Sequence, residues 1–338
     1  CEGASGDDPV AGFRQFGDFA RFDRDQGMGA QVGGFRTMVE AVAMRTTGLG
    51  GDSEVHLVTE GLNGGMRLGP RRLIPVSLLA TTQKDMVHSA LDRALATDTA
   101  GEFDGRFVVP MGGEAAAIAG LTAREAGLLA RITAPMPMAA CLTSRLEVAA
   151  LTSLVARGLV MIAGVTPSDA SHVLGRQTGW DTEAAQKAVT LLARRRNGAG
   201  ERFAIGAEPL AQGIIDQLTQ QTADCLLEAA FAEDPAFAGH EGAVLARHTL
   251  TRAGLAQHKG VVQIGLRLGV PVIGLGASAP SYYGAVGQAL GCEMILPQHA
   301  GVANAIGAVV GQISQRASAT VTSPSEGRYT VHLSLIHI

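Results

Sequence analysis

The sequence predicts a mixed α/β protein whose sheet domain is interrupted by a long helical segment. Near the C-terminal end, residues 261–266 and 270–275 are short apolar runs, rich in β-branched side chains and bounded by Gly and Pro, as buried strands are. Between residues 122 and 231, by contrast, almost all of the chain has helical periodicity. These patterns indicate two parts of one sheet domain on either side of a helical insertion.

The second apolar run leads into a loop of small residues and then into a helix. Gly276 lies in that loop, Pro280 suits the first turn of the helix, and Gly291 is expected to end it. A strand at residues 293–296 and a small-residue helix at 301–315 follow. This order predicts an α/β unit with a ligand-binding edge at the strand ends.

The N-terminal part contains shorter elements. Residues 55–58 alternate as a strand does, and residues 61–69 are a glycine-rich, hairpin-like connection. Residues 71–79 fit a strand or an extended segment, residues 83–95 a helix, and residues 106–109 a short strand.

The helical middle carries clear start signals. Thr122 and Glu125 form a capping-box pattern, and Thr166 supplies a capping hydroxyl before Pro167 and Asp169. The helices predicted here span residues 122–132, residues 142–157 with Gly158 as the stop, a short segment from Thr166, a segment from Asp181 to Arg196, and residues 208–231.

The domain organisation follows from these elements. We expect the α/β domain to comprise residues 32–120 and 236–333, the second part carrying a nucleotide-edge loop, with residues 121–235 as the helical insertion. Residues 1–31 show no convincing period, and residues 334–338 continue an apolar tail that nothing terminates. We interpret both ends as irregular and as candidates for non-native sequence, and the chain as a fragment.

Composition narrows the class of protein. The 338 residues have a formal charge of −4, which gives no reason to expect nucleic acid or an anionic membrane as partner. No apolar run reaches the roughly 18 residues of a membrane span. The four cysteines are far apart and match no metal spacing, as in a reducing compartment. We therefore expect a soluble, cytoplasmic protein.

The first candidate site is the loop at residues 48–53, which includes Gly50, Gly51, Asp52 and Ser53. Its glycines expose backbone N–H groups that suit phosphate oxygens, and its carboxylate suits Mg²⁺ or a water molecule on that ion. The alternative is a tight turn between two strands, which needs glycines just as much. It is not a Walker pattern.

The second candidate is the loop that contains Gly274, Gly276, Ala277 and Pro280. Small residues let a flat ligand approach the backbone, and the helix that follows favours negative or polar groups at its N-terminus. The alternative is an ordinary turn from strand to helix.

Two weaker candidates remain. His299 could act as a base or ligand with Asn304 as its hydrogen-bond partner, although a capping histidine and a packed asparagine fit equally well. Residues 194–196 are consecutive arginines, and a solvated helix end is the better interpretation than an anion site.

Taken together, the motifs resemble the hydantoinase/oxoprolinase family, the HyuA-type subunit. The matching segments, in collinear order within residues 32–333, are VGGFRTM at residues 32–38, RTTGLGGDSEV at 45–55, TPSDA at 166–170, the loop at 274–280 and PQHAGVANAIGA at 297–308. Members of this family share the ribonuclease-H-like fold of actin, Hsp70 and sugar kinases. They are associated with ATP-dependent opening of cyclic amides such as 5-oxoproline or hydantoins.

The resemblance implies ATP and Mg²⁺ as cofactors, a cyclic amide as substrate, a HyuB-type partner subunit and an oligomer. It also implies that Gly50, Gly51, Asp52 and Ser53 lie near the phosphates. The loop with Gly274, Gly276, Ala277 and Pro280 would then border the adenosine.

The chain departs from the family pattern in three respects. No Asp-x-Gly-Gly-Thr phosphate hairpin is present, Ala277 and Ala279 stand where many members have Gly, and Asp52 replaces a frequent Gly. An inactive fragment of an ATPase is therefore one expectation. Besides the amide hydrolase, the sequence is compatible with a metabolite-kinase-like ATPase of the same fold or with a non-catalytic nucleotide-binding subunit.

Overall fold

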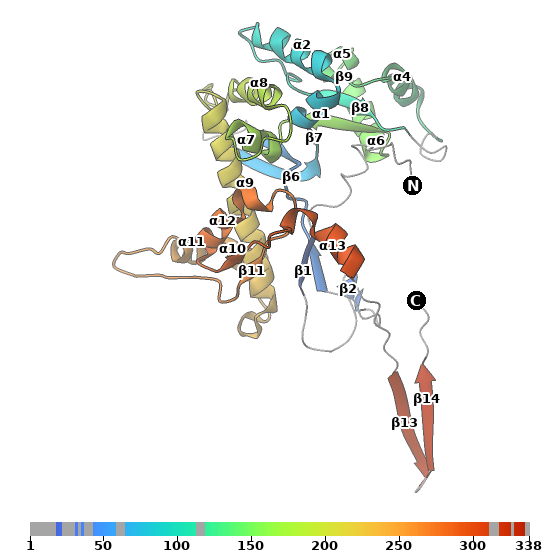
Figure 1. The fold of residues 1–338 in the computed structure, drawn as a ribbon, viewed down its shortest axis with the longest axis vertical. Coiled ribbons are helices and arrows are strands. Elements are labelled where there is room, and N and C mark those ends of the chain that lie inside the picture. Colours follow the sequence, from blue (N-terminus) through green and yellow to red (C-terminus); the bar gives the residue numbers. More distant parts are fainter. Residues whose placement is uncertain are drawn as a thin grey trace.

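The computed structural model describes residues 18–21, 31–32, 35–36, 43–58, 65–112, 119–310, 318–325 and 328–334. Within them the protein is mixed α/β, with small sheets and many helices, as the sequence predicted. Figure 1 shows an upper part around β7 to β10 and a lower part around α10 to α13, with the long helix α9 running along both. The hairpin of β13 and β14 projects away from the lower part.

The strands form one four-stranded and five two-stranded sheets within the described residues. Their pairs are β1–β4, β2–β3, β5–β6, β11–β12 and β13–β14, and the larger sheet has the order β7-β10-β8-β9. The strand bounds are β1 Asp18–Arg21, β2 Gln31–Val32, β3 Phe35–Arg36, β4 Ala43–Thr46, β5 Ser53–Val58, β6 Gly65–Arg72, β7 Ile74–Pro75, β8 Phe107–Pro110, β9 Met136–Pro137, β10 Val160–Gly164, β11 Val272–Ile273, β12 Met294–Ile295, β13 Ser318–Ser325 and β14 Arg328–Ser334.

The helices cover this framework and connect its two parts. Their bounds are α1 Val76–Thr82, α2 Lys84–Leu95, α4 Ala123–Arg131, α5 Met138–Cys141, α6 Glu147–Ala156, α7 Pro167–Val173, α8 Thr182–Ala193, α9 Ala207–Glu233, α10 Gly242–Arg247, α11 Thr249–Leu255, α12 Ala279–Leu290 and α13 Ala303–Val310, with short 3₁₀ turns η2 Pro235–Phe237 and η3 Ala300–Val302.

Helix α9 holds the fold together. It packs against α7, α8, α10, α12 and β6, and its buried face includes Ile214, Ile215 and Leu218. These side chains share one apolar core with Ile74 of β7 and Leu290 of α12. Elements from all three predicted parts of the chain therefore meet in a single core, while the domain limits themselves stay a prediction.

The central strand β10 lies in the region that the sequence predicted to be helical. It pairs in parallel with β7 and antiparallel with β8, which come from the first part of the chain. Val160 and Ala163 are fully buried in it. A short apolar run buried on both faces has no period that separates strand from helix, so local pattern missed this strand.

Several predicted boundaries are confirmed. Thr122 and Glu125 form a complete capping box at α4, and Thr166 and Asp169 form another at α7. At the other end of a helix, Gly291 ends α12 in the left-handed conformation with a φ of 60°. The helices predicted at 83–95 and 208–231, and the start of one at Asp181, also agree with α2, α9 and α8.

Other predictions are wrong. Residues 261–266 form no strand but an irregular segment, in which the Leu266 amide donates to the Gly254 carbonyl of α11 over 3.0 Å. Val261 is fully exposed there, because no neighbouring strand pairs with the segment. The strand or extended segment predicted at 71–79 is present as the end of β6 and as β7, but it stops at Pro75 and α1 begins at Val76. Near the start of the chain, β1 lies within the segment expected to be irregular and pairs with β4.

Parts of some predictions fall outside the described residues. These are most of residues 1–31, the hairpin connection at 61–64, the last residues of the helix expected at 301–315, the tail from 335 onward, and Gly33, Gly34, Thr37 and Met38 of the first family-like motif.

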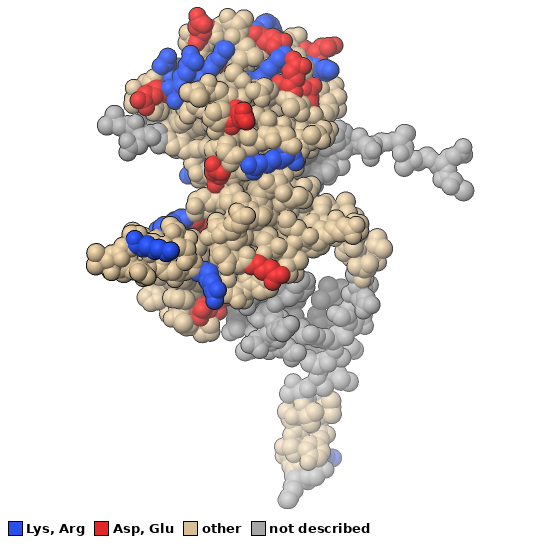
Figure 2. Space-filling model, turned by 60° about the vertical axis from the view of Figure 1, so that its left-hand side comes forward, with Lys and Arg blue, Asp and Glu red and all other residues tan. Residues whose placement is uncertain are grey.

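Charge is unevenly distributed on the surface. Figure 2 shows more Lys, Arg, Asp and Glu side chains on the upper part than on the lower part of the face shown. Large apolar side chains are exposed in the lower part, among them Val262, Ile273, Val309 and Val310. Among the described residues, no helix combines the length and apolarity needed to cross a membrane.

Candidate functional site

Both predicted glycine loops meet at Gly51. A Cβ added at this glycine would lie 2.8 Å from the Ser168 hydroxyl oxygen and 3.3 Å from the Ser278 Cβ. Ser168 belongs to the first turn of α7, and Ser278 directly precedes α12. The structure thus brings together the loop at 48–53, the segment at 166–170 and the loop at 274–280, which are far apart in the sequence.

The loop at 48–53 is fixed by its own hydrogen bonds. The Gly50 amide donates to the Ser53 hydroxyl oxygen over 2.8 Å, and the Ser53 amide donates back to the Gly50 carbonyl over 3.2 Å. Ser53 and Gly50 are buried, whereas Gly51 is half-buried. Ser53 therefore shapes the loop from inside, and Gly51 is the part that a ligand could reach.

Asp169 anchors α7 beside this loop. Its carboxylate is fully buried and accepts hydrogen bonds from the amides of Val76, Ser77 and Thr166 and from the hydroxyls of Ser77 and Thr166, over 2.6 to 3.3 Å. Burial raises the pKa of Asp169, and the donors from Ser77 and Thr166 oppose that shift. The contacts join the start of α1 to the start of α7, which positions Ser168 against Gly51.

The Asp52 side chain is paired with Arg72. The Arg72 Nε donates to its carboxylate over 2.5 Å. Burial raises the pKa of Asp52, while the Arg72 charge and hydrogen bond oppose that shift. A carboxylate held in this way has lost much of its capacity to bind a cation, so the predicted Mg²⁺ role of Asp52 does not fit this geometry.

The second predicted loop is shaped by close packing. A Cβ at Gly274 would collide with the Tyr283 ring, so only glycine fits there. Gly276 adopts a φ of +111°, and its amide donates to the Ala300 carbonyl over 2.8 Å. A Cβ added at Gly301 would lie 3.7 Å from the Ala277 Cα. The segment at 297–308 therefore borders this loop, and Pro280 occupies the first turn of α12 as predicted.

The polar groups around Gly51 are suited to an oxyanion. In the described part of the chain, neither the Gly51 amide nor the Ser168 hydroxyl has a hydrogen-bond partner of its own. The Ser278 side chain hydrogen-bonds the hydroxyl of Tyr282, whose pKa burial raises well above its usual range. The amides of Ser168 and Asp169 are already used, by the Gly51 carbonyl and the Thr166 hydroxyl. Phosphate oxygens would thus meet one amide and the serine hydroxyls, not a free helix end.

The weaker candidates do not join this site. His299 and Asn304 are exposed, and the backbone carbonyl of His299 caps η3. Arg194, Arg195 and Arg196 donate to the backbone carbonyls of Leu95, Glu102 and Gly200. Arg196 is exposed, as a solvated helix end predicts, whereas Arg194 and Arg195 are half-buried. Arg195 also lines a recess that no sequence pattern indicated.

Ser168, Ser278 and Asp169 were not predicted as site residues. The sequence signal at Thr166 and Asp169 was a helix cap, and only the fold reveals that this cap lies against Gly51. Across the described ranges, no group of three or more His, Cys, Asp or Glu side chains is arranged to hold a metal ion.

Comparisons with protein-family models, curated proteins and solved structures found no match.

Proposed function

We propose that this chain is a subunit of an ATP-dependent hydrolase that opens a cyclic amide of the hydantoin or 5-oxoproline type. The observation that supports the proposal most strongly is the meeting at Gly51 of Ser168 and Ser278. Those three residues come from three of the segments that resemble the hydantoinase/oxoprolinase family, and a fourth segment joins them through Ala300. A mixed α/β architecture is compatible with the ribonuclease-H-like fold that the resemblance implies, and that finer assignment is part of the proposal.

The residues suit the first step of such a reaction. Bound ATP would supply a phosphoryl group that turns the poorly reactive amide oxygen into a leaving group. The Gly51 amide and the Ser168 hydroxyl would donate hydrogen bonds to phosphoryl oxygens, where preformed donors stabilise developing charge. The loop at 274–280 would bear on the nucleoside side through Ala277, which is exposed, whereas Gly274 is buried against Tyr283. Mg²⁺ would be bound through phosphate and water, since Asp52 is occupied by Arg72.

ATP turnover separates this proposal from the competing functions. The protein is incubated with Mg²⁺-ATP and either 5-oxoproline, hydantoin or no amide, alone and with a HyuB-type partner subunit. Phosphate release that depends on an amide and yields the opened acid supports the hydrolase. A stable phosphorylated product supports a metabolite kinase, and ATP binding without turnover in either mixture supports a non-catalytic nucleotide-binding subunit. Absence of ATP binding by the folded protein contradicts all three.

A further inference from the structure

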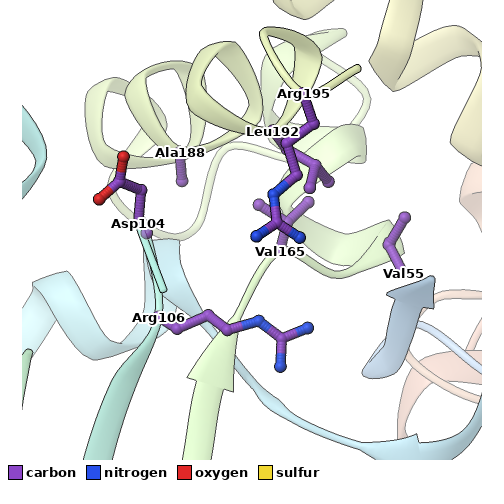
Figure 3. A pocket seen from close by; sticks show the side chains of 8 residues that line it. Val55, Asp104, Arg106, Val165, Ala188, Leu192 and Arg195 are labelled. Atoms are coloured by element: carbon purple, nitrogen blue, oxygen red, sulfur yellow. The ribbon is translucent and has the colours of Figure 1, made fainter. Parts of the chain in front are cut away.

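A small recess lies beside strand β5, away from the two glycine loops. It has a volume of about 20 Å³, room for about one water molecule. Figure 3 shows the side chains of Arg106 and Arg195 reaching into it from opposite sides. The recess is lined by Val55, Asp104, Gly105, Arg106, Val165, Ala188, Leu192 and Arg195.

Arg195 is half-buried without a carboxylate to neutralise it. Its guanidinium donates to the Glu102 carbonyl, and within the described residues no carboxylate lies within ion-pair distance of it. Burial lowers the pKa of Arg195, and the positive charge of Arg106 lowers it further, although Glu102 and Asp104 oppose both effects. The two positive charges therefore face a shared, partly desolvated space. An anion bound there would offset the repulsion between them.

Arg106 is held in place by a buried carboxylate. Its Nη2 donates to the Glu54 Oε1 over 2.5 Å, and the Glu54 side chain is only 2% exposed. The other Glu54 oxygen faces Arg71 at 3.7 Å and His56 at 3.3 Å. Glu54 thus orients the Arg106 guanidinium and leaves its remaining N–H groups free to bind a ligand.

We propose that the recess between Arg106 and Arg195 binds the carboxylate group of a small metabolite. Planar guanidinium groups match a planar carboxylate through paired hydrogen bonds. Because the recess has room for about one water molecule, one carboxylate oxygen would lie between the two guanidinium groups and the rest of the metabolite would lie outside.

The carboxylate fits better than a phosphate. A phosphate carries more negative charge at neutral pH than a carboxylate. Glu54 already neutralises part of the Arg106 charge, and the Asp104 carboxylate, engaged by the Gly101 amide over 2.7 Å, adds a negative charge beside the recess. The positive charge that remains unbalanced at the recess is therefore small, which favours a singly charged anion over a doubly charged one.

This site is separate from the proposed nucleotide site and does not depend on it. Val55 lies two residues beyond Ser53 on β5, and Val165 directly precedes the Thr166 cap of α7. The recess and the Gly51 site thus both lie beside β5 and the start of α7, but they are formed by different side chains. Its test needs neither ATP nor turnover.

Acetate and its neutral analogue acetamide provide the matched probes. The Nε–Hε NMR signals of Arg106 and Arg195 are followed during titration of the protein with each, at constant ionic strength kept with chloride. Acetate should shift both signals saturably, and acetamide and chloride should not. Equal shifts with acetamide or with chloride would overturn the proposal. A competition in which inorganic phosphate binds about tenfold more tightly than acetate would overturn the assignment to carboxylates.

Two variants locate the effect. Arg195→Gln should weaken acetate binding by about tenfold or more, as expected for loss of a hydrogen bond to a charged group. Arg194→Gln is the matched control, because Arg194 also donates to carbonyls but does not line the recess. If Arg195→Gln does not fold, Arg195→Lys keeps the charge without the planar fork and should weaken binding less. Unchanged acetate affinity in a folded Arg195 variant would refute the site.

Discussion

The backbone amide of Ser168 donates a hydrogen bond to the carbonyl oxygen of Gly51 over 2.8 Å. This contact joins the first turn of α7 to the loop before β5, and it holds the Ser168 hydroxyl where a side chain at position 51 would have to be. Asp169, next to Ser168, secures the same turn through donors from Ser77 and Thr166. The geometry of the candidate site therefore depends on a glycine at position 51.

Replacing that glycine should disrupt the site. In Gly51→Ala the new Cβ would lie 2.8 Å from the Ser168 hydroxyl oxygen, closer than real Cβ contacts come. Either the Ser168 hydroxyl rotates away from its place beside Gly51 or the loop and α7 separate, which should lower the unfolding free energy by up to about 3 kcal/mol. Chemical denaturation measures this loss. Gly127→Ala in α4 is the matched control, because an added Cβ meets nothing there, and it should leave stability unchanged or raise it by up to about 1 kcal/mol.

The collision also predicts a rescue. Removing the hydroxyl in Gly51→Ala/Ser168→Ala leaves the Ser278 Cβ, at 3.3 Å, as the next close neighbour. The double variant should therefore recover part of the stability that Gly51→Ala loses, and a double-mutant cycle measures the coupling. Strictly additive losses would show that the added methyl group does not collide with the Ser168 hydroxyl.

Asp169 should be among the most sensitive polar residues. In Asp169→Ala, donors from Val76, Ser77 and Thr166 lose their acceptor at a fully buried position. Leaving several buried donors unsatisfied should cost at least about 3 kcal/mol. Asp234 offers the comparison, because it caps only the Ala236 amide at an exposed position, and Asp234→Ala should cost about 1 kcal/mol or less. Similar losses in thermal or chemical unfolding of both variants would contradict this account of Asp169.

The role of α9 as the central support can be tested with two isoleucines. Ile214 is fully buried in the core that joins α9 to the sheets, whereas Ile205, just before the helix, is 95% exposed. Ile214→Ala should lower the unfolding free energy by about 2–5 kcal/mol, and Ile205→Ala should change it by less than about 0.5 kcal/mol. Equal effects in urea denaturation would show that α9 is not packed as described.

Two glutamates make the unfolding free energy depend on pH in the acid range. The pKa of Glu125 is lowered from 4.5 to about 2 by hydrogen bonds from Ser153 and Thr122, and that of Glu147 is lowered to about 2 by hydrogen bonds from Arg131 and Thr143. Because the folded-state values are depressed, the stabilisation is present above pH 4.5 and is lost as the pH falls toward 2. Unfolding near pH 3 should therefore take up about two protons at these two sites.

A variant isolates this contribution. Glu125→Gln/Glu147→Gln should reduce the proton uptake on unfolding by about two, measured from the pH dependence of the unfolding free energy. Glu241→Gln is the control, since Glu241 is exposed and its side chain caps nothing. An unchanged pH slope in the double variant would exclude these two groups as its source.

Local signals in the sequence predicted local features well. Thr122 with Glu125 and Thr166 with Asp169 form the capping boxes expected of them, because a cap depends on residues three positions apart. The strand β10 was missed and the strand at 261–266 was wrongly expected, because a strand exists only where a distant segment pairs with it. Val261, which is fully exposed, belongs to an apolar run that pairs with no distant strand.

The candidate site was predictable only in part. Gly51 and Gly276 were selected from their own loops, since exposed backbone is a local property. The position of Ser168 against Gly51 depends on how α7 packs beside β5, which no local pattern encodes. The same holds for Arg195, whose sequence neighbours indicated a solvated helix end, while the fold places it opposite Arg106.

Equilibrium binding of ATP is the most direct test of the central claim, that the loops meeting at Gly51 hold a nucleotide. Calorimetric titration with Mg²⁺-ATP compares the unsubstituted protein with Gly51→Ala and Gly127→Ala, each first shown to be folded. The unsubstituted protein and Gly127→Ala should bind ATP saturably with similar affinity, and Gly51→Ala should bind at least about tenfold more weakly, a loss of about 1.4 kcal/mol. Absence of ATP binding by the folded protein, or undiminished binding by Gly51→Ala, would contradict the claim.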